Sequence, residues 1–407
     1  MTALSSRHGN ARIVESARRR LRDRVEAEAY VASVCFKHGP PTLMGAELEW
    51  IVHHADDPRR PLEARRLTDA LGPHTPRTLD NDSPEIPLPA GSPLTLEPGG
   101  QVEISTLPQP SLRQVFDAVE ADLAFLSELL ASAGLILSDR ATDRHRQPRR
   151  LLDTPRYSAM ERAFRPIGPH GLTMMCATAA LQVCLDVGEP DASAARWSAV
   201  TALGPVLVAA FANSPGDGWA SSRMRSVLAT DPPRSTPSSI VDDPVGAWAT
   251  RVIDTPVLCV RDGVERWTTP AGMTFADWLA GARPEPPTTD DLDYHLSTMF
   301  PPVRPHGYLE VRYIDTQPGD TWRTPVALLT ALLSTPATTD AVLDACLPVG
   351  DRWIPAARDG LADRAVAKAA GTVIDVGARA LPAMGLGHPL TNTILTDLDR
   401  LLDKAAS

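Results

Sequence analysis

The sequence predicts an α+β fold built around one sheet and one core. Short segments in which apolar and polar residues alternate are separated by long helical stretches. Four of these alternating segments carry acidic or amide residues at every second position, so each would turn a polar face away from an apolar one. With 407 residues and 43% apolar content, the chain can bury a sizeable core. We therefore expect a single domain over residues 1–407.

The first part of the chain is expected to contribute two helices and three strands. Amphipathic spacing predicts a helix over 11–37, and a Ser cap followed by helical apolar spacing predicts another over 111–134. Alternation predicts a strand over 42–53, and two short strands, 93–97 and 100–106, flank a Pro-Gly-Gly turn. A polar, Pro-rich excursion separates the first strand from this pair.

The remaining elements follow from similar patterns. Residues 171–187 form an apolar run that fits a strand or a helix, and its β-rich end favours a strand. We expect a buried helix over 191–212, a hairpin over 256–268 with Asp-Gly at its centre, and a strand over 307–315. From residue 324 onward the pattern is helical, so the chain would end in helices packed outside the sheet.

Composition excludes several classes of partner. The net charge is −10 and the pI about 5.5, which disfavours binding to nucleic acid or to an anionic membrane. No apolar run approaches the roughly 20 residues of a membrane helix, and the N-terminus has no apolar signal core. Five cysteines without a CxxC pair fit reduced thiols in a cytoplasmic protein. No heptad or long apolar face predicts an oligomer, so a monomer is expected.

Residues i and i+2 of a strand share a face, and this places the unusual polar residues together. Each polar face lies opposite an apolar one, as when Leu48 separates two acids. The pairs that share a face are Glu47 with Glu49, Gln101 with Glu103, Glu310 with Arg312 and, if the segment is a strand, Thr178 with Gln182. If all four segments join one sheet, at least four carboxylates gather on one side of it.

Crowded carboxylates repel one another, and a hard divalent cation such as Mg2+ relieves this repulsion. Arginines nearby would hold the negative oxygens of a substrate or nucleotide. The polar faces therefore predict a site for a metal–nucleotide complex. The alternative for each strand taken alone is an ordinary half-exposed strand with its polar face in water.

Other signatures of chemistry are missing. The sequence contains no GxxxxGK[ST], HExxH or GxSxG motif. Cys176 and Cys184 lack a supporting His and are interpreted as buried structural thiols. His53 and His54 are expected at the surface, at the end of the first strand.

Several motifs occur in the order found in one family. They are "MGAELEW", "TLEPGGQVEIS", "PRYSAM", "GPHGLTMMCATAALQVCLDV", "LVAAFANSP" with "SSRMRSVLATD", and "HLSTMFPPVRPHGYLEVRYID". Between about residues 42 and 325 the chain thus resembles glutamate–cysteine ligases of the plant and actinobacterial type. The most specific motif is the LEPGGQ-x-E run. Residues 326–407 carry no motif of that family.

The resemblance implies a single catalytic domain with a glutamine-synthetase-like fold. In such ligases a curved, mainly antiparallel sheet of about six strands forms a funnel-like active site, and helices pack outside it. ATP phosphorylates the γ-carboxylate of L-glutamate, and the amine of L-cysteine then displaces the phosphate to give γ-glutamylcysteine. Arg-rich usage suggests an actinobacterial source, for which the product would feed ergothioneine synthesis.

The resemblance also implies roles for residues at matching positions. Arg225 would pair with the substrate's α-carboxylate, Arg312 with the transferred phosphoryl group, and Arg304 with the nucleotide. The Mg2+ ligands would be Glu47, Glu49, Glu103 and Glu310, with Glu97 a weaker candidate. The amino-acid pocket would be lined by Gln101, Thr178, Gln182, Tyr157 and Asn213.

The chain differs from plant members at Cys176 and Ala177, which leaves the amine acceptor open. Two alternatives follow: a ligase that uses a different amine, and a silent member that binds glutamate or nucleotide as a regulator. The Pro-rich segments 54–92 and 232–245 are candidate lids, with plain surface loops as the alternative.

Overall fold

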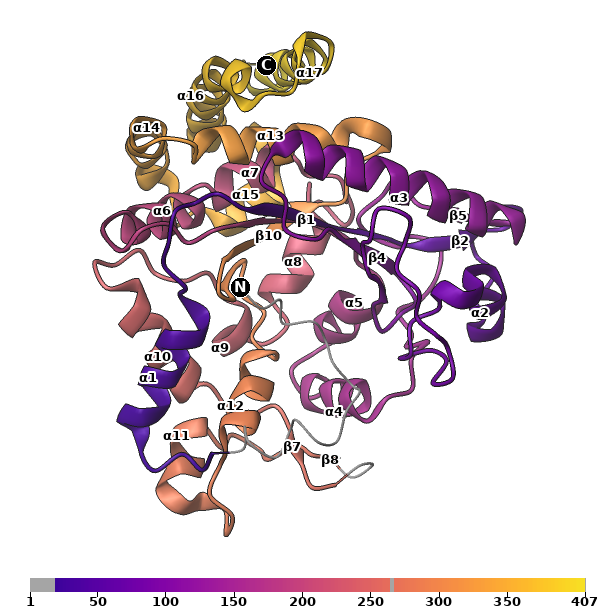
Figure 1. The fold of residues 1–407 in the computed structure, drawn as a ribbon, viewed down its shortest axis with the longest axis vertical. Coiled ribbons are helices and arrows are strands. Elements are labelled where there is room, and N and C mark those ends of the chain that lie inside the picture. The colour runs from indigo at the N-terminus through magenta and orange to yellow at the C-terminus, as the bar shows by residue number, and fades with distance from the viewer. Residues whose placement is uncertain (1–18, 264–266, 407) are drawn as a thin grey trace.

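The computed structural model describes residues 19–263 and 267–406 (Figure 1). Its strands are β1 (Met44–Trp50), β2 (Val52–His54), β3 (Leu94–Leu96), β4 (Val102–Ser105), β5 (Leu135–Leu137), β6 (Ala180–Leu185), β7 (Val260–Arg261), β8 (Trp267–Thr268), β9 (Val303–Pro305) and β10 (Leu309–Asp315). Its helices up to the hairpin are α1 (Arg24–Cys35), α2 (Ala64–Leu71), α3 (Leu112–Ser132), α4 (Pro155–Phe164), α5 (His170–Cys176), α6 (Pro190–Ala202), α7 (Gly204–Ala210), α8 (Ser222–Leu228), α9 (Pro232–Ser235) and α10 (Pro244–Asp254). Later helices are α11 (Phe275–Asp277), α12 (Thr289–Leu296), α13 (Arg323–Leu332), α14 (Pro336–Cys346), α15 (Trp353–Asp359), α16 (Arg364–Ala380) and α17 (His388–Ala406).

Six strands form one sheet in the order β3-β4-β1-β6-β10-β9, and every neighbouring pair is antiparallel. The remaining strands form two small pairs, β2 with β5 and β7 with β8. This confirms the predicted α+β class and the six-stranded antiparallel sheet. The hairpin expected over 256–268 is the β7–β8 pair.

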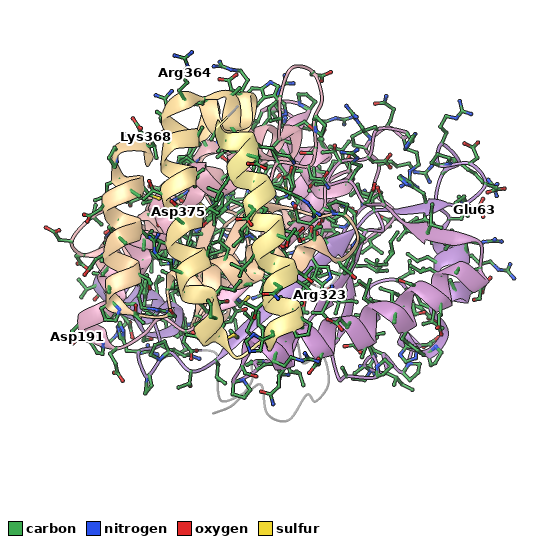
Figure 2. All side chains as sticks on the ribbon, turned by 90° about the horizontal axis from the view of Figure 1, so that it is seen from above. Glu63, Asp191, Arg323, Arg364, Lys368 and Asp375 are labelled. Atoms are coloured by element: carbon green, nitrogen blue, oxygen red, sulfur yellow. The ribbon has the colours of Figure 1, made fainter. Side chains whose placement is uncertain are left out.

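The sheet divides the molecule into two layers (Figure 1). On one side lie α3, α7 and α13, with α16 and α17 beyond them, and on the other lie α8, α5 and α4. Seen from above, the C-terminal helices run side by side, with Arg364, Lys368 and Asp375 along α16 (Figure 2). Apolar side chains such as Leu48, Val183 and Val311 fill the core. Burial of this apolar surface is the main force that fixes the sheet against its helices.

Two predicted elements are divided differently in the structure. Residues 171–187 are not one strand, because α5 ends at Cys176 and β6 begins only at Ala180. The helix predicted over 191–212 breaks into α6 and α7 at Gly204, where the ring of Trp353 fills the space that a side chain would need. The following Pro205 lacks the N–H that would continue the helix. Gly204 and Pro205 are visible in the sequence as helix breakers, whereas the contact with Trp353 comes from a distant part of the chain.

The first two predicted elements are shorter than expected. Within the predicted helix 11–37, the helix itself starts at Arg24, after an Asp23 cap that accepts a hydrogen bond from the Glu26 N–H. Residues 11–18 lie outside the described residues. The strand expected over 42–53 ends at Trp50, and the chain then pairs with β5 in a separate sheet.

We also searched the helices for candidate membrane spans. Within residues 19–263 and 267–406, no single helix has the length and hydropathy to cross a membrane, although one pair bent by 106°, Gly319–Leu332 with Pro336–Val349, passes by length and composition.

Candidate active site

The register of the sheet lines up the predicted polar residues in rows across the strands. Glu49 of β1 stands opposite Glu103 of β4, and Thr95 of β3 stands on the other side of Glu103. Two positions along β1, Glu47 faces Gln182 of β6. Because alternate residues share a face, these side chains gather on the side of the sheet that faces α8 and α5 (Figure 1).

Three carboxylates approach one another most closely. Glu49, Glu97 and Glu103 each offer an oxygen, and these atoms all lie within 4.8 Å of one another. Glu97 reaches the cluster from the turn between β3 and β4, where its N–H donates to the Gln101 carbonyl at 2.9 Å. The turn passes so close to Cys176 that a side chain at Gly99 would overlap the backbone there. This close approach explains why the turn carries glycine at position 99.

Burial and mutual repulsion raise the pKa values of the acids in this part of the sheet. Burial first, and then the charges of Glu97 and Glu49, raise the pKa of Glu103 to about 8. Burial and the Glu49 charge raise the pKa of Glu97 to about 7. Burial raises the pKa of Glu49, and burial together with Glu103 and Glu310 raises that of Glu47. Carboxylates kept this close at neutral pH favour a proton or a cation between them.

Glu310 is neutralised by protein instead. Arg304 donates Nε and Nη2 to its two oxygens, the latter at 2.9 Å, and Arg312 Nη1 lies 3.2 Å away. Although burial alone would raise the pKa of Glu310, the two guanidinium groups lower it to about 2. The predicted partners Arg304, Arg312 and Glu310 are therefore brought together, as a group of net positive charge beside the acid cluster.

A chain of hydrogen bonds joins this group to the acid cluster. Arg312 Nη1 donates to Gln182 Oε1 at 2.6 Å, and Gln182 Nε2 donates to Glu49 at 2.9 Å. The backbone N–H of Ala180 donates to the second oxygen of Glu49 at 2.8 Å. Gln182 thus lies between a cation and an anion and orients both.

Gln101 and Tyr157 lie at the same cluster. Gln101 Nε2 donates to the Thr178 and Met175 carbonyls, while its Oε1 is buried without a hydrogen-bond partner in the described part of the chain. Such an acceptor, beside three carboxylates, suits a hard cation or a donor group of a substrate. Burial and then the Glu97 charge raise the pKa of Tyr157, so its hydroxyl stays protonated near the acids.

The two arginines of the "SSRMRS" motif point in different directions. Arg225 lies over the Trp219 ring at 5.4 Å and 3.6 Å from Asp217, with 36% of its side chain exposed. Arg223 is buried, donates to the Arg312 carbonyl at 2.7 Å and lies 3.7 Å from Asp315. Sequence reasoning missed Arg223, although positions two apart on a helix cannot share a face.

The side-chain N–H and O–H groups of the two other predicted pocket residues donate to backbone carbonyls. Thr178 donates its hydroxyl to the Met174 carbonyl at 2.7 Å. Asn213 Nδ2 donates to the Asp139 and Thr316 carbonyls, and its own N–H donates to Asp315. Their proposed contacts with substrate stay predictions, and the observed bonds fix loops around the site.

The prediction that His53 and His54 are surface residues is wrong, because both are buried. His53 Nε2 lies 3.3 Å from Asp143, and its ring packs edge-on against His145 at 5.3 Å. Burial would raise the pKa of Asp143, but the adjacent His53 ring, a hydrogen bond from the His145 N–H and the charge of Arg146 lower it. Both histidines are covered because β2 pairs with β5.

The five cysteines are free, and Cys176 is buried while Cys184 is half-buried.

Comparisons with known proteins agree with this geometry. A family model described as glutamate-cysteine ligase family 2 (GCS2) matches residues 43–390. The chain is 37% identical over 377 residues to glutamate–cysteine ligase EgtA of Mycolicibacterium smegmatis, covering 88% of this chain and 85% of that protein. It is 36% identical over 401 residues to EgtA of Mycobacterium tuberculosis, covering 95% and 90%. The chloroplastic glutamate–cysteine ligase of Arabidopsis thaliana is 31% identical, covering 67% and 54%.

A solved structure shares the fold. A bifunctional glutathione synthetase from Pasteurella multocida superposes with a TM-score of 0.51 at 12% identity, covering 94% of this chain and 49% of that one.

Proposed function

Because the chain belongs to the glutamate–cysteine ligase family 2, we propose that it joins the γ-carboxylate of L-glutamate to the amine of L-cysteine at the expense of ATP. The observation that carries the proposal is the cluster of Glu49, Glu97 and Glu103 beside the Arg304–Glu310–Arg312 group. The three glutamates could hold a metal ion that binds the nucleotide phosphates. The two arginines supply positive charge that would stabilise the phosphoryl group during its transfer.

In the first step a γ-carboxylate oxygen of glutamate attacks the γ-phosphorus of ATP, and the bond to the β–γ bridging oxygen breaks. The products are γ-glutamyl phosphate and ADP. Phosphoryl transfer depends mostly on positioning and charge neutralisation. Arg312 is already fixed by Glu310 and Gln182, so its guanidinium can meet the developing charge without rearranging.

We assign Mg2+ to the acidic side of the sheet, with Glu47, Glu49, Glu103 and Glu310 as ligands and Glu97 as a further one. The donor set fits this ion, since it consists of carboxylates with an unpartnered amide oxygen from Gln101. When bound, Mg2+ would neutralise nucleotide phosphates. Arg304 already donates two hydrogen bonds to the Glu310 carboxylate, so Arg304 would have to move before Glu310 could bind the metal ion.

In the second step the cysteine amine attacks the acyl carbon of γ-glutamyl phosphate. Phosphate leaves with one oxygen that came from glutamate, and the amine proton passes to solvent or phosphate. The remaining proposed roles are an α-carboxylate contact for Arg225, a nucleotide contact for Arg304 and a pocket formed by Gln101, Gln182, Thr178, Tyr157 and Asn213.

We further propose that residues 1–407 act as one catalytic domain and as a monomer in the cytoplasm. The five free thiols favour a reducing compartment. Resemblance to actinobacterial ligases places the product upstream of ergothioneine synthesis. A different amine acceptor is the second candidate, since Cys176 and Ala177 differ from plant members.

Release of ADP tests the activity and the acceptor together. With Mg2+ and ATP, ADP should form steadily only when glutamate and cysteine are both present, and γ-glutamylcysteine should appear in equal amount. Release of ADP with another amine but not with cysteine would show that this amine, and not cysteine, is the acceptor. Absence of glutamate-dependent release with every amine tested would remove the enzyme assignment.

A further inference from the structure

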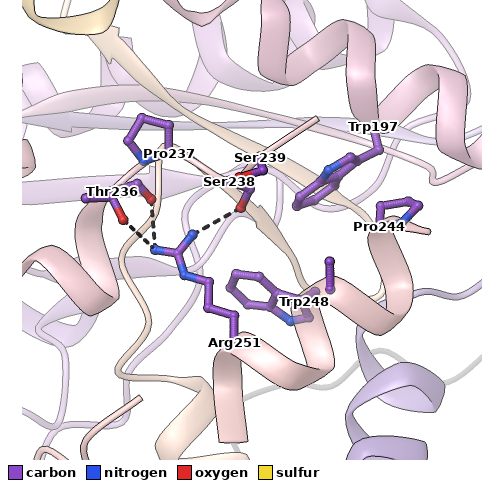
Figure 3. Close-up of a pocket in the computed structure, with 9 residues that line it drawn as sticks. Trp197, Thr236, Pro237, Ser238, Ser239, Pro244, Trp248 and Arg251 are labelled. Carbon is purple, nitrogen blue, oxygen red and sulfur yellow. Dashed lines mark hydrogen bonds between the residues drawn. The ribbon is translucent and has the colours of Figure 1, made fainter. Parts of the chain in front are cut away.

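A cavity of about 240 Å³ lies between α6, α10 and the segment that joins α9 to α10 (Figure 3). The indoles of Trp197 and Trp248 form its apolar walls, and Arg251, Ser238 and Ser239 form its polar side. None of the residues assigned above to the acidic site lines this cavity. It therefore requires an explanation of its own.

Arg251 is held rigidly at the edge of the cavity. Its Nη2 donates to the carbonyl oxygens of Thr236 at 2.8 Å and Pro233 at 3.1 Å, and its Nη1 donates to the Ser238 hydroxyl at 3.2 Å (Figure 3). The guanidinium centre lies 5.8 Å from the centroid of the Trp248 ring. Nε also donates to the Pro233 carbonyl and Nη2 to the Thr236 hydroxyl, so the group left to meet an anion is the second N–H of Nη1.

Among the described residues, no acid balances the charge of Arg251. Burial lowers the pKa of Arg251 to about 10, and no charge of a described neighbour opposes this effect. Other buried arginines have acidic neighbours: Arg234 bonds Asp231 at 2.7 Å, and Arg223 lies 3.7 Å from Asp315. Even Arg196, which binds three carbonyl oxygens, feels the charge of Asp186. Arg251 differs from these in combining an unbalanced charge with an adjoining cavity.

A second polar group at the cavity also lacks a partner. Trp197 is 1% exposed, and its indole N–H makes no hydrogen bond to any described residue. The Trp248 N–H likewise makes no hydrogen bond to any described residue, although it lies near the Cys35 thiol. A buried N–H without an acceptor is unfavourable, and an anion in the cavity would supply one.

We propose that this cavity binds a small organic anion, with a carboxylate facing Arg251 and the serine hydroxyls and an apolar body packed against the indoles, whose centroids lie 6.5 Å apart at a tilt of 58°. The remaining N–H of Arg251 and the hydroxyls of Ser238 and Ser239 can together hold a carboxylate. Aromatic walls favour an apolar body through stacking and burial. Inorganic phosphate would satisfy Arg251 but leave the two indole faces uncovered.

Titration of the full chain with benzoate tests the proposal, with binding followed by tryptophan fluorescence and calorimetry. Benzoate should bind saturably at one site per chain, and the neutral isostere benzamide should bind at least about tenfold more weakly. Arg251→Gln and Arg251→Lys should each weaken benzoate binding by about tenfold or more. The matched control is Arg283→Gln, which removes an arginine that lies 5.6 Å from the Trp278 centroid but pairs with Asp262; it should leave binding unchanged.

Trp197→Phe provides an independent variant, because it keeps Arg251 and most of the wall but removes the unpartnered N–H. It should weaken benzoate binding several-fold while the melting temperature stays near that of the parent. Equal affinity for benzoate and benzamide overturns the proposal, as does full displacement of benzoate by an equal concentration of phosphate. Unchanged benzoate affinity in both Arg251→Lys and Trp197→Phe also overturns it. These outcomes concern binding alone and are independent of ligase activity.

Discussion

Glu49 of β1 and Glu103 of β4 are direct register partners, and only 7% and 9% of their surfaces are exposed. Like charges opposite one another in an antiparallel pair oppose folding. The sheet therefore keeps an unfavourable arrangement that a proton or a divalent cation relieves.

The metal-free protein should become less stable as pH rises from about 5 to about 8. The pKa values of Glu97 and Glu103 are raised to about 7 and about 8 from the ordinary 4.5. A raised folded-state pKa gives stability that is fully present below the unfolded value and is lost as pH rises through the folded one. Each tenfold change in acidity is worth about 1.4 kcal/mol, so denaturant titrations in EDTA should show a loss of a few kcal/mol. A metal-free stability that stays level or rises across this range would contradict it.

Mg2+ should reverse this trend and release protons on binding. Because the cation competes with protons for the same carboxylates, its stabilising effect should grow with pH. Calorimetry in two buffers of different ionisation enthalpy measures the protons released, and melting curves measure the stabilisation. Equal stabilisation at pH 5.5 and pH 8 would show that Mg2+ binds elsewhere.

Glu103→Gln should separate stability from activity. Removal of one charge relieves repulsion, so the metal-free variant should be at least as stable as the parent at pH 8, whereas Mg2+-dependent ADP release should fall by about 100-fold or more. Glu28→Gln on α1 is the matched control, since among residues 19–263 and 267–406 that acid forms an ion pair with Arg24 alone. A Glu103→Gln enzyme with full turnover would remove this residue from the metal site.

Arg223 and Arg225 should respond differently to substitution by Gln. Arg223→Gln leaves Asp315 buried without its cation and should destabilise the fold by about 3 kcal/mol. Arg225→Gln should change stability by less than about 1 kcal/mol, because Arg225 is partly exposed, but should raise the KM for glutamate. Denaturation curves and initial rates distinguish the two, and an unchanged KM in Arg225→Gln would refute the α-carboxylate contact.

Arg312→Gln should lower kcat more than it raises the KM for ATP. Its guanidinium is positioned by Glu310 and Gln182 before substrate arrives, as a group that acts on developing charge requires. A decrease of about 100-fold in kcat is expected. A change confined to KM would mean that Arg312 binds nucleotide without assisting phosphoryl transfer.

The alternation of polar residues was sufficient to predict much of the site. Glu47 and Glu49 share one side of β1 because side chains in strands alternate, and Glu103 joins them because β4 pairs with β1 in the register that sets it opposite Glu49. The Arg304–Glu310 pair could not be read in this way, since it depends on β9 pairing with β10 in one register.

Other features depend on contacts between distant segments. His53 is buried because the chain after β1 leaves the main sheet and pairs with β5. Arg223 faces the sheet and Arg225 does not, because of how α8 is rotated, and the sequence carries no signal for that rotation. The division of 191–212 at Gly204 depends on Trp353, about 150 residues away in the chain.

Positional isotope transfer tests the central claim most directly. Glutamate labelled with ¹⁸O in its γ-carboxylate is incubated with the enzyme, Mg2+, ATP and cysteine, and the released phosphate is analysed by mass spectrometry. We predict one ¹⁸O atom in each phosphate released, with ADP as the other nucleotide product. Unlabelled phosphate, or label found in AMP, would contradict a γ-glutamyl phosphate formed at this acidic sheet.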